Sequence, residues 1–245
     1  MKSYSLTDTG RVRSMNEDYV FVSERPIGRL SNLFVVADGM GGHNAGERAS
    51  SYAVEVLLQS IRKNKEKNPV KVMRRAIESA NDMVYQESIS SDRSRGMGTT
   101  MVAAVICKDR LYVANVGDSR LYIINSQIRQ ITKDHSLVEE MVRLGKLTKE
   151  EGRNHPDKNI ITRAVGAEET VQIDCFEERI GIRDVVLLCS DGLTNMVSDE
   201  QIQQIINTEK NLQKAAELLV ETANRNGGRD NITVLLISRK SNEVK

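Results

Sequence analysis

The sequence lacks any long apolar run. No stretch approaches the roughly 18 consecutive apolar residues of a membrane span, and the N-terminal segment MKSYSLTDTGRVRSMNED has no apolar core of the secretory type. We therefore expect a cytoplasmic protein that does not insert into membranes. Low-complexity segments, solenoid repeats and Pro/Ser-rich linkers are also absent. Residues 1–240 are accordingly predicted to form a single domain, followed by a polar tail at 241–245.

An excess of charge of one sign is equally absent. Lys and Arg number 35 and Asp and Glu number 34, so the chain as a whole does not attract nucleic acids or acidic membranes. The sequence also contains no P-loop and no dinucleotide-binding fingerprint. We expect no nucleic-acid partner, and any electrostatic effect must be local.

Cysteine is scarce. Cys107, Cys175 and Cys189 are widely spaced, and each lies in an apolar, strand-like run. An odd number of distant cysteines does not suit a disulfide framework or a zinc site. We interpret all three as reduced residues of the core.

Two segments, 45–61 and 72–84, carry apolar residues at helical spacing. Asn44 and Glu47 are spaced as a capping box for the first, and Pro69 suits the first turn of the second. The short charged segment between them predicts an antiparallel helix pair. A second pair is expected at 201–206 and 212–223.

Most other apolar runs are rich in β-branched residues and bounded by Gly, Asp or Asn, as is typical of strands. They are LFVVA, TTMVAAVIC, RLYVANV, RLYIIN, VVLLCS and NITVLLIS. Residues 99–132 predict a meander of closely joined antiparallel strands. Strands and a helix pair in each half predict two packed sheets with helices on their outer faces. The mostly polar segment 136–163, with a helical pattern at 137–142, is expected to form a functional flap.

Carboxylates recur beside glycines at the ends of these strands. The instances are Asp38-Gly39, Gly117-Asp118, Asp191-Gly192 and Asp230, with Arg13, Glu17 and Asp18 ahead of a further strand. Each Asp-Gly pair alone is typical of a turn. Together they place several carboxylates where glycines let backbone and ligand come close.

If these strand ends converge, the carboxylates repel one another in a partly dry site and need cations to offset their charge. The three histidines and the cysteines do not join the pattern, so zinc-type ligation is not expected. An all-oxygen site suits Mg²⁺ or Mn²⁺. Two such ions about 4 Å apart can activate water against a phosphoryl group.

An ordered set of motifs extends this interpretation. From about residue 7 to 238 the chain carries R-x-x-N-E-D, V-V-A-D-G-M-G-G-H, G-T-T, A-N-V-G-D-S-R, D-H-S, C-S-D-G-L and D-N-I-T-V. This set resembles the metal-dependent Ser/Thr protein phosphatases of the protein phosphatase 2C (PPM) family, especially the stand-alone bacterial type. The resemblance implies an α+β fold, in which a central β-sandwich of two antiparallel sheets is flanked by antiparallel helix pairs in α-β-β-α layers.

The resemblance also implies the activity. It is the hydrolysis of phosphoserine and phosphothreonine on proteins by a metal-bridged hydroxide, without a phospho-enzyme intermediate. The single domain would then be the catalytic domain. The expected partners are phosphorylated proteins, with a bacterial Ser/Thr protein kinase and its substrates among them, and the expected state is a monomer.

Roles for the metal ligands come from the same resemblance. Asp38 is expected to bridge two Mn²⁺ or Mg²⁺ ions, and Gly39 to give its backbone carbonyl to one of them. Asp191 and Asp230 are expected to hold the other ion. With Asp191, Asp118 matches the residue that holds a weaker third ion in bacterial members.

Three further positions complete the implied site. Glu17 matches an acidic residue that binds metal through water, and Arg13 matches the arginine that clamps the substrate phosphate, for which its planar fork is suited. Eukaryotic members place a histidine, the proposed general acid, directly after the first Asp-Gly pair, where this chain has Met40. His43 nearby either supplies that proton or only orders the loop, and a metal-bound water is another proton source.

Two alternatives stay open at this point. One is an inactive, phosphatase-like binding module, and the other is a hydrolase of a different phosphate ester. The presence of every implied carboxylate argues against the first, and the absence of a nucleotide-binding motif argues against the second.

Overall fold

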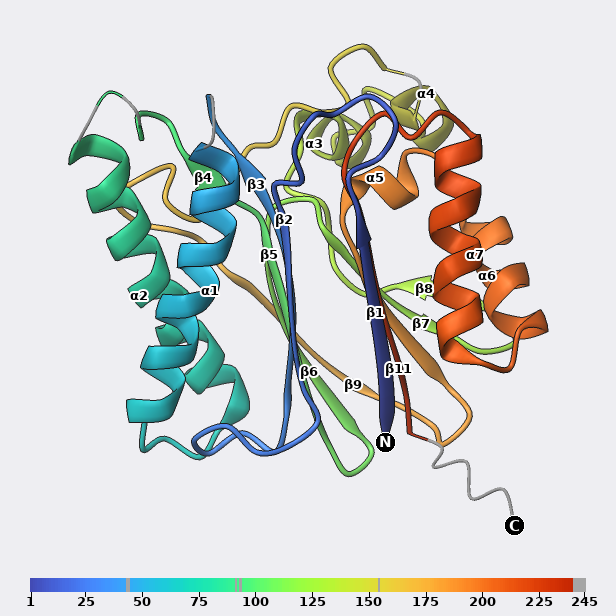
Figure 1. Ribbon diagram of the computed structural model, residues 1–245, viewed down its shortest axis with the longest axis horizontal. Coiled ribbons are helices and arrows are strands. Elements are labelled where there is room, and N and C mark those ends of the chain that lie inside the picture. The colour runs from blue at the N-terminus through green and yellow to red at the C-terminus, as the bar shows by residue number, and fades with distance from the viewer. Residues whose placement is uncertain (43–44, 91, 93, 154, 240–245) are drawn as a thin grey trace.

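The computed structural model describes residues 1–42, 45–90, 92, 94–153 and 155–239. In this part of the chain, two antiparallel sheets pack face to face, and a helix pair covers each outer face (Figure 1). The predicted α+β sandwich with α-β-β-α layers is confirmed.

The first sheet has the strand order β2-β3-β5-β6-β9, with the short strand β4 paired to β3. Its strands are β2 (Asp18–Ser23), β3 (Leu33–Met40), β4 (Gly98–Thr99), β5 (Met101–Cys107), β6 (Arg110–Val116) and β9 (Asp174–Arg179). The second sheet has the order β1-β11-β10-β7-β8. Its strands are β1 (Lys2–Asp8), β7 (Arg120–Ile124), β8 (Ile128–Gln130), β10 (Val185–Cys189) and β11 (Ile232–Ser238).

Helices α1 (Ala45–Lys63) and α2 (Pro69–Ser90) cover the first sheet, and α6 (Asp199–Thr208) and α7 (Leu212–Arg225) cover the second (Figure 1). Both predicted pairs are confirmed, and Pro69 opens α2 as expected. The capping box that forms is at α6, between Ser198 and Gln201. The one predicted at Asn44 lies outside the described residues.

Apolar side chains fill three layers. One cluster lies between α1, α2 and the first sheet, and another between α6, α7 and the second sheet. The third lies between the sheets and includes Phe34, Val102, Leu121, Leu188 and Leu235. Because alternate residues of a strand face opposite ways, a strand such as β3 contributes to two of these layers and is buried on both faces.

The predicted meander is wrong in one respect. Strands β5 and β6 pair in the first sheet, but the chain then crosses to the second sheet, where β7 pairs with β8 and β10. The crossing occurs at residues 117–119, and Gly117 has the positive φ of 99° that such a sharp change of direction requires. A run of closely spaced strands cannot by itself show which sheet each strand joins.

Other differences are local. Strand β1 was not predicted. Strands β8 and β9 were predicted only in part, because β8 lies within the expected meander of 99–132 and Cys175 of β9 was placed in a strand-like run, but neither strand was given its bounds. Cys107 is exposed at the end of β5, so the expectation that all three cysteines lie in the core is wrong for this residue. The expected flap contains helix α3 (Leu137–Arg143), as predicted, and a second short helix, α4 (Lys149–Arg153).

Candidate active site

Strand pairing brings the first two carboxylates together. Asp18 and Asp38 are direct cross-strand partners on β2 and β3. The backbone of Asp38 is fixed by Thr100, whose hydroxyl accepts its N–H (2.9 Å) and whose own N–H donates to its carbonyl oxygen (2.8 Å). Strand β3 continues through Gly39 to pair with β4. The Asp-Gly pair is therefore part of a strand, and the expectation that Asp38 ends its strand is wrong by two residues.

The second sheet supplies two more carboxylates. Asp191 lies two residues after the end of β10 and begins α5 (Asp191–Thr194), and Asp230 precedes β11 by two residues. Ser190 joins the two sheets, since its hydroxyl donates to Oδ2 of Asp18 (2.7 Å) and its N–H donates to the carbonyl oxygen of Thr233 (3.2 Å). The ends of strands from both sheets therefore meet at one place.

Asp118 lies where the chain crosses between the sheets. It is 9% exposed, and the hydroxyl of its neighbour Ser119 lies 2.7 Å from the hydroxyl of Thr100, which also binds Asp38. The crossing that the sequence did not predict is thus what carries Asp118 to the other carboxylates.

The charges of these groups act on one another. Burial, with the neighbouring charges of Asp18 and Asp191, raises the pKa of Asp38 well above its usual value. Burial raises the pKa of Asp18 to about 7, with Asp191 adding to it and the Ser190 hydroxyl opposing it. Burial also raises the pKa of Asp191 to about 6, where Asp230 adds to it, and that of Asp118 to about 8, where Asp191 adds to it. The predicted convergence of these carboxylates is confirmed.

Arg13 and Glu17 lie at the edge of this cluster. Nη2 of Arg13 is 2.8 Å from Oδ2 of Asp230, and its side chain is 48% exposed. The N–H of Glu17 donates to the side-chain oxygen of Asn231 (2.8 Å), and the Asn231 amide donates to the carbonyl of Met15 (2.8 Å). Asn231, which follows Asp230 directly, therefore ties the N-terminal loop to the segment before β11.

Two of the glycines are required by close packing. A Cβ on Gly39 would collide with the carbonyl oxygen of Gly46 at the start of α1, and a Cβ on Gly192 would collide with that of Asn231. These contacts bring α1 against β3, and α5 against the loop before β11. The glycine of each Asp-Gly motif thus lets the segment that carries the carboxylate pack closely against its neighbour.

The sequence analysis gave no role to Asp18, although it noted the residue. Asp18 is 8% exposed and lies opposite Asp38. A buried strand that begins with a carboxylate is the pattern that would have pointed to it, because an uncompensated buried charge is costly. Its burial is evident only from the packing of the sheets.

The cluster fits a hard metal ion in its chemistry. Oδ1 of Asp18 and Oδ1 of Asp191 are buried and have no hydrogen-bond partner among the described residues, although buried carboxylate oxygens are normally paired. As the side chains stand, no group of three or more His, Cys, Asp or Glu in the described ranges could hold an ion. One carboxylate oxygen of Asp230 is instead bonded to Arg13, at 2.8 Å. Oxygen-only donors suit Mn²⁺ or Mg²⁺.

The two histidines that the structure describes, His135 and His155, do not lie among the clustered carboxylates. His43 lies outside the described residues, so its role as acid or loop-ordering group stays a prediction. His135 is 5% exposed; its Nδ1 accepts the N–H of Gly117 (3.1 Å), and its Nε2 lies 3.3 Å from Asp174. His155 faces Asp157 within the flap.

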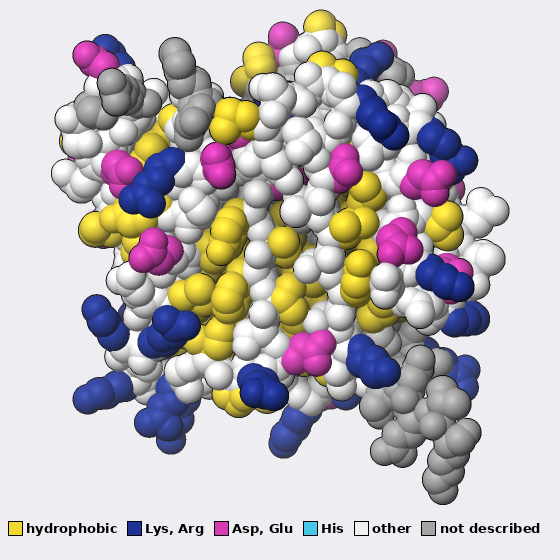
Figure 2. Space-filling view, in the orientation of Figure 1, with side chains coloured by type: hydrophobic (Ala, Val, Ile, Leu, Met, Phe, Trp, Pro, Cys, Tyr) yellow, Lys and Arg dark blue, Asp and Glu magenta, His cyan; other side chains and the backbone are white. Residues whose placement is uncertain are grey.

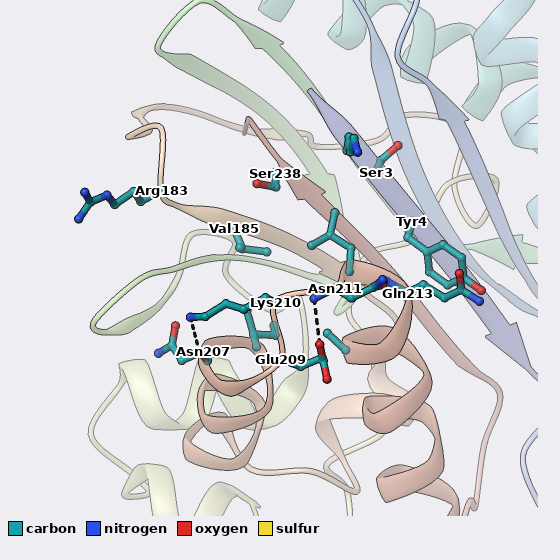
Figure 3. A pocket seen from close by; sticks show the side chains of 14 residues that line it. Ser3, Tyr4, Arg183, Val185, Asn207, Glu209, Lys210, Asn211, Gln213 and Ser238 are labelled. Atoms are coloured by element: carbon teal, nitrogen blue, oxygen red, sulfur yellow. Dashed lines mark hydrogen bonds between the residues drawn. The ribbon is translucent and has the colours of Figure 1, made fainter. Parts of the chain in front are cut away.

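A pocket of about 520 Å³ lies at the other end of the second sheet (Figure 3). Its lining includes Tyr4, Arg183, Val185, Asn207, Lys210 and Gln213. Because Lys2 pairs with Ser238 at this end of β1, whereas Asp8 pairs with Ile232 near the carboxylates, the two regions are about 20 Å apart. The pocket contains none of the predicted site residues.

Comparison with known proteins shows which family the chain belongs to. The protein phosphatase 2C family model matches residues 10–235. The chain belongs to the protein phosphatase 2C family. It is 42% identical to the serine/threonine phosphatase stp of Listeria welshimeri over 238 residues, which are 95% of this chain and 94% of the relative.

Solved structures agree. The phosphatase superposes on the serine/threonine phosphatase Stp1 from Staphylococcus aureus with a TM-score of 0.91 at 36% identity, over 98% of this chain and 95% of the other. It superposes on the catalytic domain of PstP, solved in complex with two manganese ions, with a TM-score of 0.84 at 33% identity, over 96% of each chain.

These findings bear out the main expectations. The chain is a serine/threonine phosphatase of the 2C type, a hydrolase that acts on phosphorylated proteins and uses Mn²⁺ or Mg²⁺. None of its described helices combines the length and the apolar character needed to cross a membrane.

Proposed function

We propose that Asp38, Gly39, Asp191 and Asp230 hold the two ions on which this phosphatase depends. The observation that supports the proposal is geometric. Strand ends from both sheets bring buried carboxylates together, and the buried Oδ1 atom of Asp191 has no partner among the described residues. Asp18, whose Oδ1 is unpartnered as well, adds a buried negative charge to the same cluster.

Within this site Asp38 would bridge the ions, and the carbonyl of Gly39 would bind one of them. Glu17 would act through a water molecule, which its position at the edge of the cluster allows. Asp118, with Asp191, would hold a weaker third ion, which the effect of the Asp191 charge in raising the pKa of the buried Asp118 supports.

Arg13 would bind the phosphate of the substrate. Its guanidinium is half exposed and is held beside the cluster by Asp230. A planar guanidinium can meet two phosphate oxygens at once. Arg13 would orient the phosphoryl group over the carboxylate cluster, and Asp230 would keep the guanidinium in place between turnovers.

When bound, two such ions supply a nucleophile from water near neutral pH and offset the charge that develops on the phosphoryl group. The chain's own residues have other tasks: the carboxylates set the positions of the ions, and Arg13 orients the phosphate. No covalent step through a side chain is proposed.

The remaining expectations belong to this proposal. The phosphatase would oppose a Ser/Thr protein kinase, acting on that kinase and its substrates. It would work as a monomer in the cytoplasm, with residues 1–240 as one catalytic domain and 241–245 as a polar tail.

The experiment is phosphate release from a phosphothreonine peptide by metal-stripped protein, with and without Mn²⁺. Wild type should be active only with Mn²⁺, and Asp191→Asn should lose most of that activity. The control is Asp82→Asn, an exposed residue of α2. The Mn²⁺-induced rise in melting temperature gives a second readout, which should be present in wild type and in the control and reduced in Asp191→Asn.

Other outcomes would contradict the proposal. Metal-independent activity would exclude the assigned ligands. No activity in any form would favour the binding-module alternative, and faster hydrolysis of nucleotides than of phosphopeptides would favour the alternative of another phosphate ester.

A further inference from the structure

Two loops from opposite ends of the chain are joined at the edge of the active site. The carbonyl oxygen of Gly228 accepts backbone hydrogen bonds from Arg11 (2.7 Å) and Val12 (3.2 Å). Residues 9–13 and 227–231 therefore form one surface, which we name the arginine platform.

Close backbone contact fixes this platform. Gly10 has a φ of 82°, and a Cβ there would collide with the carbonyl oxygen of Asp230. Gly228 has a φ of 51°, and a Cβ there would lie 2.8 Å from Cγ of Arg11. The stem of Arg11 thus lies directly against the residue that precedes Arg229, and the two arginines come from loops that cannot move apart independently.

The platform carries two uncompensated cations. Arg13 is paired with Asp230, but Arg11 and Arg229 are exposed, and neither makes an ion pair or a side-chain hydrogen bond within the part of the chain that the structure describes. The whole chain has a net charge of only +1. A local excess of positive charge beside the site is therefore a property of these loops and not of the protein at large.

We propose that Arg11 and Arg229 recognise an anionic side chain, a carboxylate or a second phosphate, next to the phosphorylated residue of the substrate. The inference rests on the proposed function, in which Arg13 binds the phosphate that is removed. Arg11 is two residues from Arg13, and Arg229 is next to Asp230, to which Arg13 is bonded at 2.8 Å. A phosphate held at Arg13 therefore has a guanidinium on each adjoining loop.

The size of the effect follows from exposure. Ion pairs between exposed groups are weak and are screened by salt. Two of them should favour a substrate with acidic neighbours by about 3- to 10-fold in kcat/KM over a neutral one at low salt. A second phosphate carries nearly two charges and should give a larger preference than a carboxylate.

The test uses phosphothreonine peptides of one sequence that differ only beside the phosphorylated residue. The neighbours are Gln, Glu, Lys or a second phosphothreonine, and the readout is the ratio of kcat/KM to that of the Gln peptide, with Mn²⁺ present. The enzymes are wild type, Arg11→Gln/Arg229→Gln, and the control Arg29→Gln. Arg29 is an exposed arginine between β2 and β3, at the end of the sandwich away from the carboxylates, where Figure 2 shows Lys and Arg side chains gathered along the lower edge.

Wild type and the control should prefer Glu and phosphothreonine neighbours and discriminate against Lys, and the preference should shrink as salt is added. The double variant should give ratios near one. Unchanged ratios in the double variant, or the same loss in the control, would overturn the inference. A preference for the second phosphate alone would restrict the ligand to phosphate. If no peptide releases phosphate with wild type, it is the proposed function that fails, because this inference concerns only the ratios.

Discussion

Replacing Asp18 by Asn should stabilise the metal-free protein, and more so at high pH. In the folded protein the pKa of Asp18 is raised to about 7, chiefly by burial. In the unfolded chain it returns to about 3.9. The folded state therefore holds its proton more tightly, and the free energy of unfolding falls as pH rises between these two values.

The magnitude follows from the difference in pKa. A difference of about three pKa units corresponds to roughly 4 kcal/mol above pH 7. At pH 5 the folded carboxyl is protonated and about 1.5 kcal/mol of this destabilisation is present. Asp18→Asn cannot ionise and should avoid this destabilisation at either pH. The difference in free energy of unfolding between Asp18→Asn and wild type should therefore grow by about 2 to 3 kcal/mol from pH 5 to pH 8.

The assay is urea unfolding in the presence of EDTA at both pH values, for wild type, Asp18→Asn and the exposed control Asp82→Asn. Taking the difference between proteins at each pH removes the contribution of titrating groups that do not interact with Asp18, and the repulsion that Asp18 exerts on Asp38 is counted with the effect of Asp18 itself. An advantage for Asp18→Asn that is the same at pH 5 and pH 8 would refute the reasoning, because it would show that Asp18 is not a buried group with a raised pKa. A pH-dependent gain of the same size in Asp82→Asn would refute it as well.

Three further variants test the packing around the site. Gly192→Ala should lower the free energy of unfolding by roughly 1 to 3 kcal/mol, because its Cβ would collide with the carbonyl of Asn231; an unchanged urea midpoint would show that the facing loop yields freely. Arg120→Met should cost about 3 to 5 kcal/mol in a thermal melt, since it leaves the mostly buried Asp134, bonded at 2.6 Å, without its ion-pair partner and with only the hydrogen bond from Gln130; a cost below about 1 kcal/mol would mean that the pair behaves as a surface pair. Burial lowers the pKa of His135, partly offset by Asp174, so the contribution of this residue to stability should fall as pH drops below about 6.5; in urea unfolding, the free energy of unfolding of His135→Gln relative to wild type should therefore rise from pH 7 to pH 5, and a difference that is the same at both pH values would contradict the assignment.

Much of the fold could be predicted from local patterns. Apolar residues at a spacing of 3.6 residues predicted the helices that the structure has at 45–63, 69–90, 199–208 and 212–225. This signal depends only on the local sequence. The strands rich in Val, Ile and Leu were predicted from their β-branched composition and from the Gly, Asp or Asn residues that bound them. The extent of the polar strand β9 was not predicted, because this strand lies at the edge of its sheet, where neither face need be continuously apolar.

The candidate site divides in a similar way. Its Asp-Gly motifs are linear, so the sequence determined their order and the resemblance to the 2C family. The sequence also determined that the candidate metal ligands are oxygen donors. Its balance of positive and negative charge excluded an electrostatic attraction of the whole protein for nucleic acids or acidic membranes.

Only the tertiary structure decided which residues meet. The crossing at Gly117 carries Asp118 to the carboxylates, and the pairing of β2 with β3 brings Asp18 opposite Asp38. The bonds to Gly228 place Arg11 beside Arg229, more than two hundred residues along the chain. Such contacts depend on strands that pair across the whole sequence, as β1 does with β11. Local sequence propensity does not predict these contacts, because the register of the strands and the burial of their side chains are set only when the two sheets pack around a shared core.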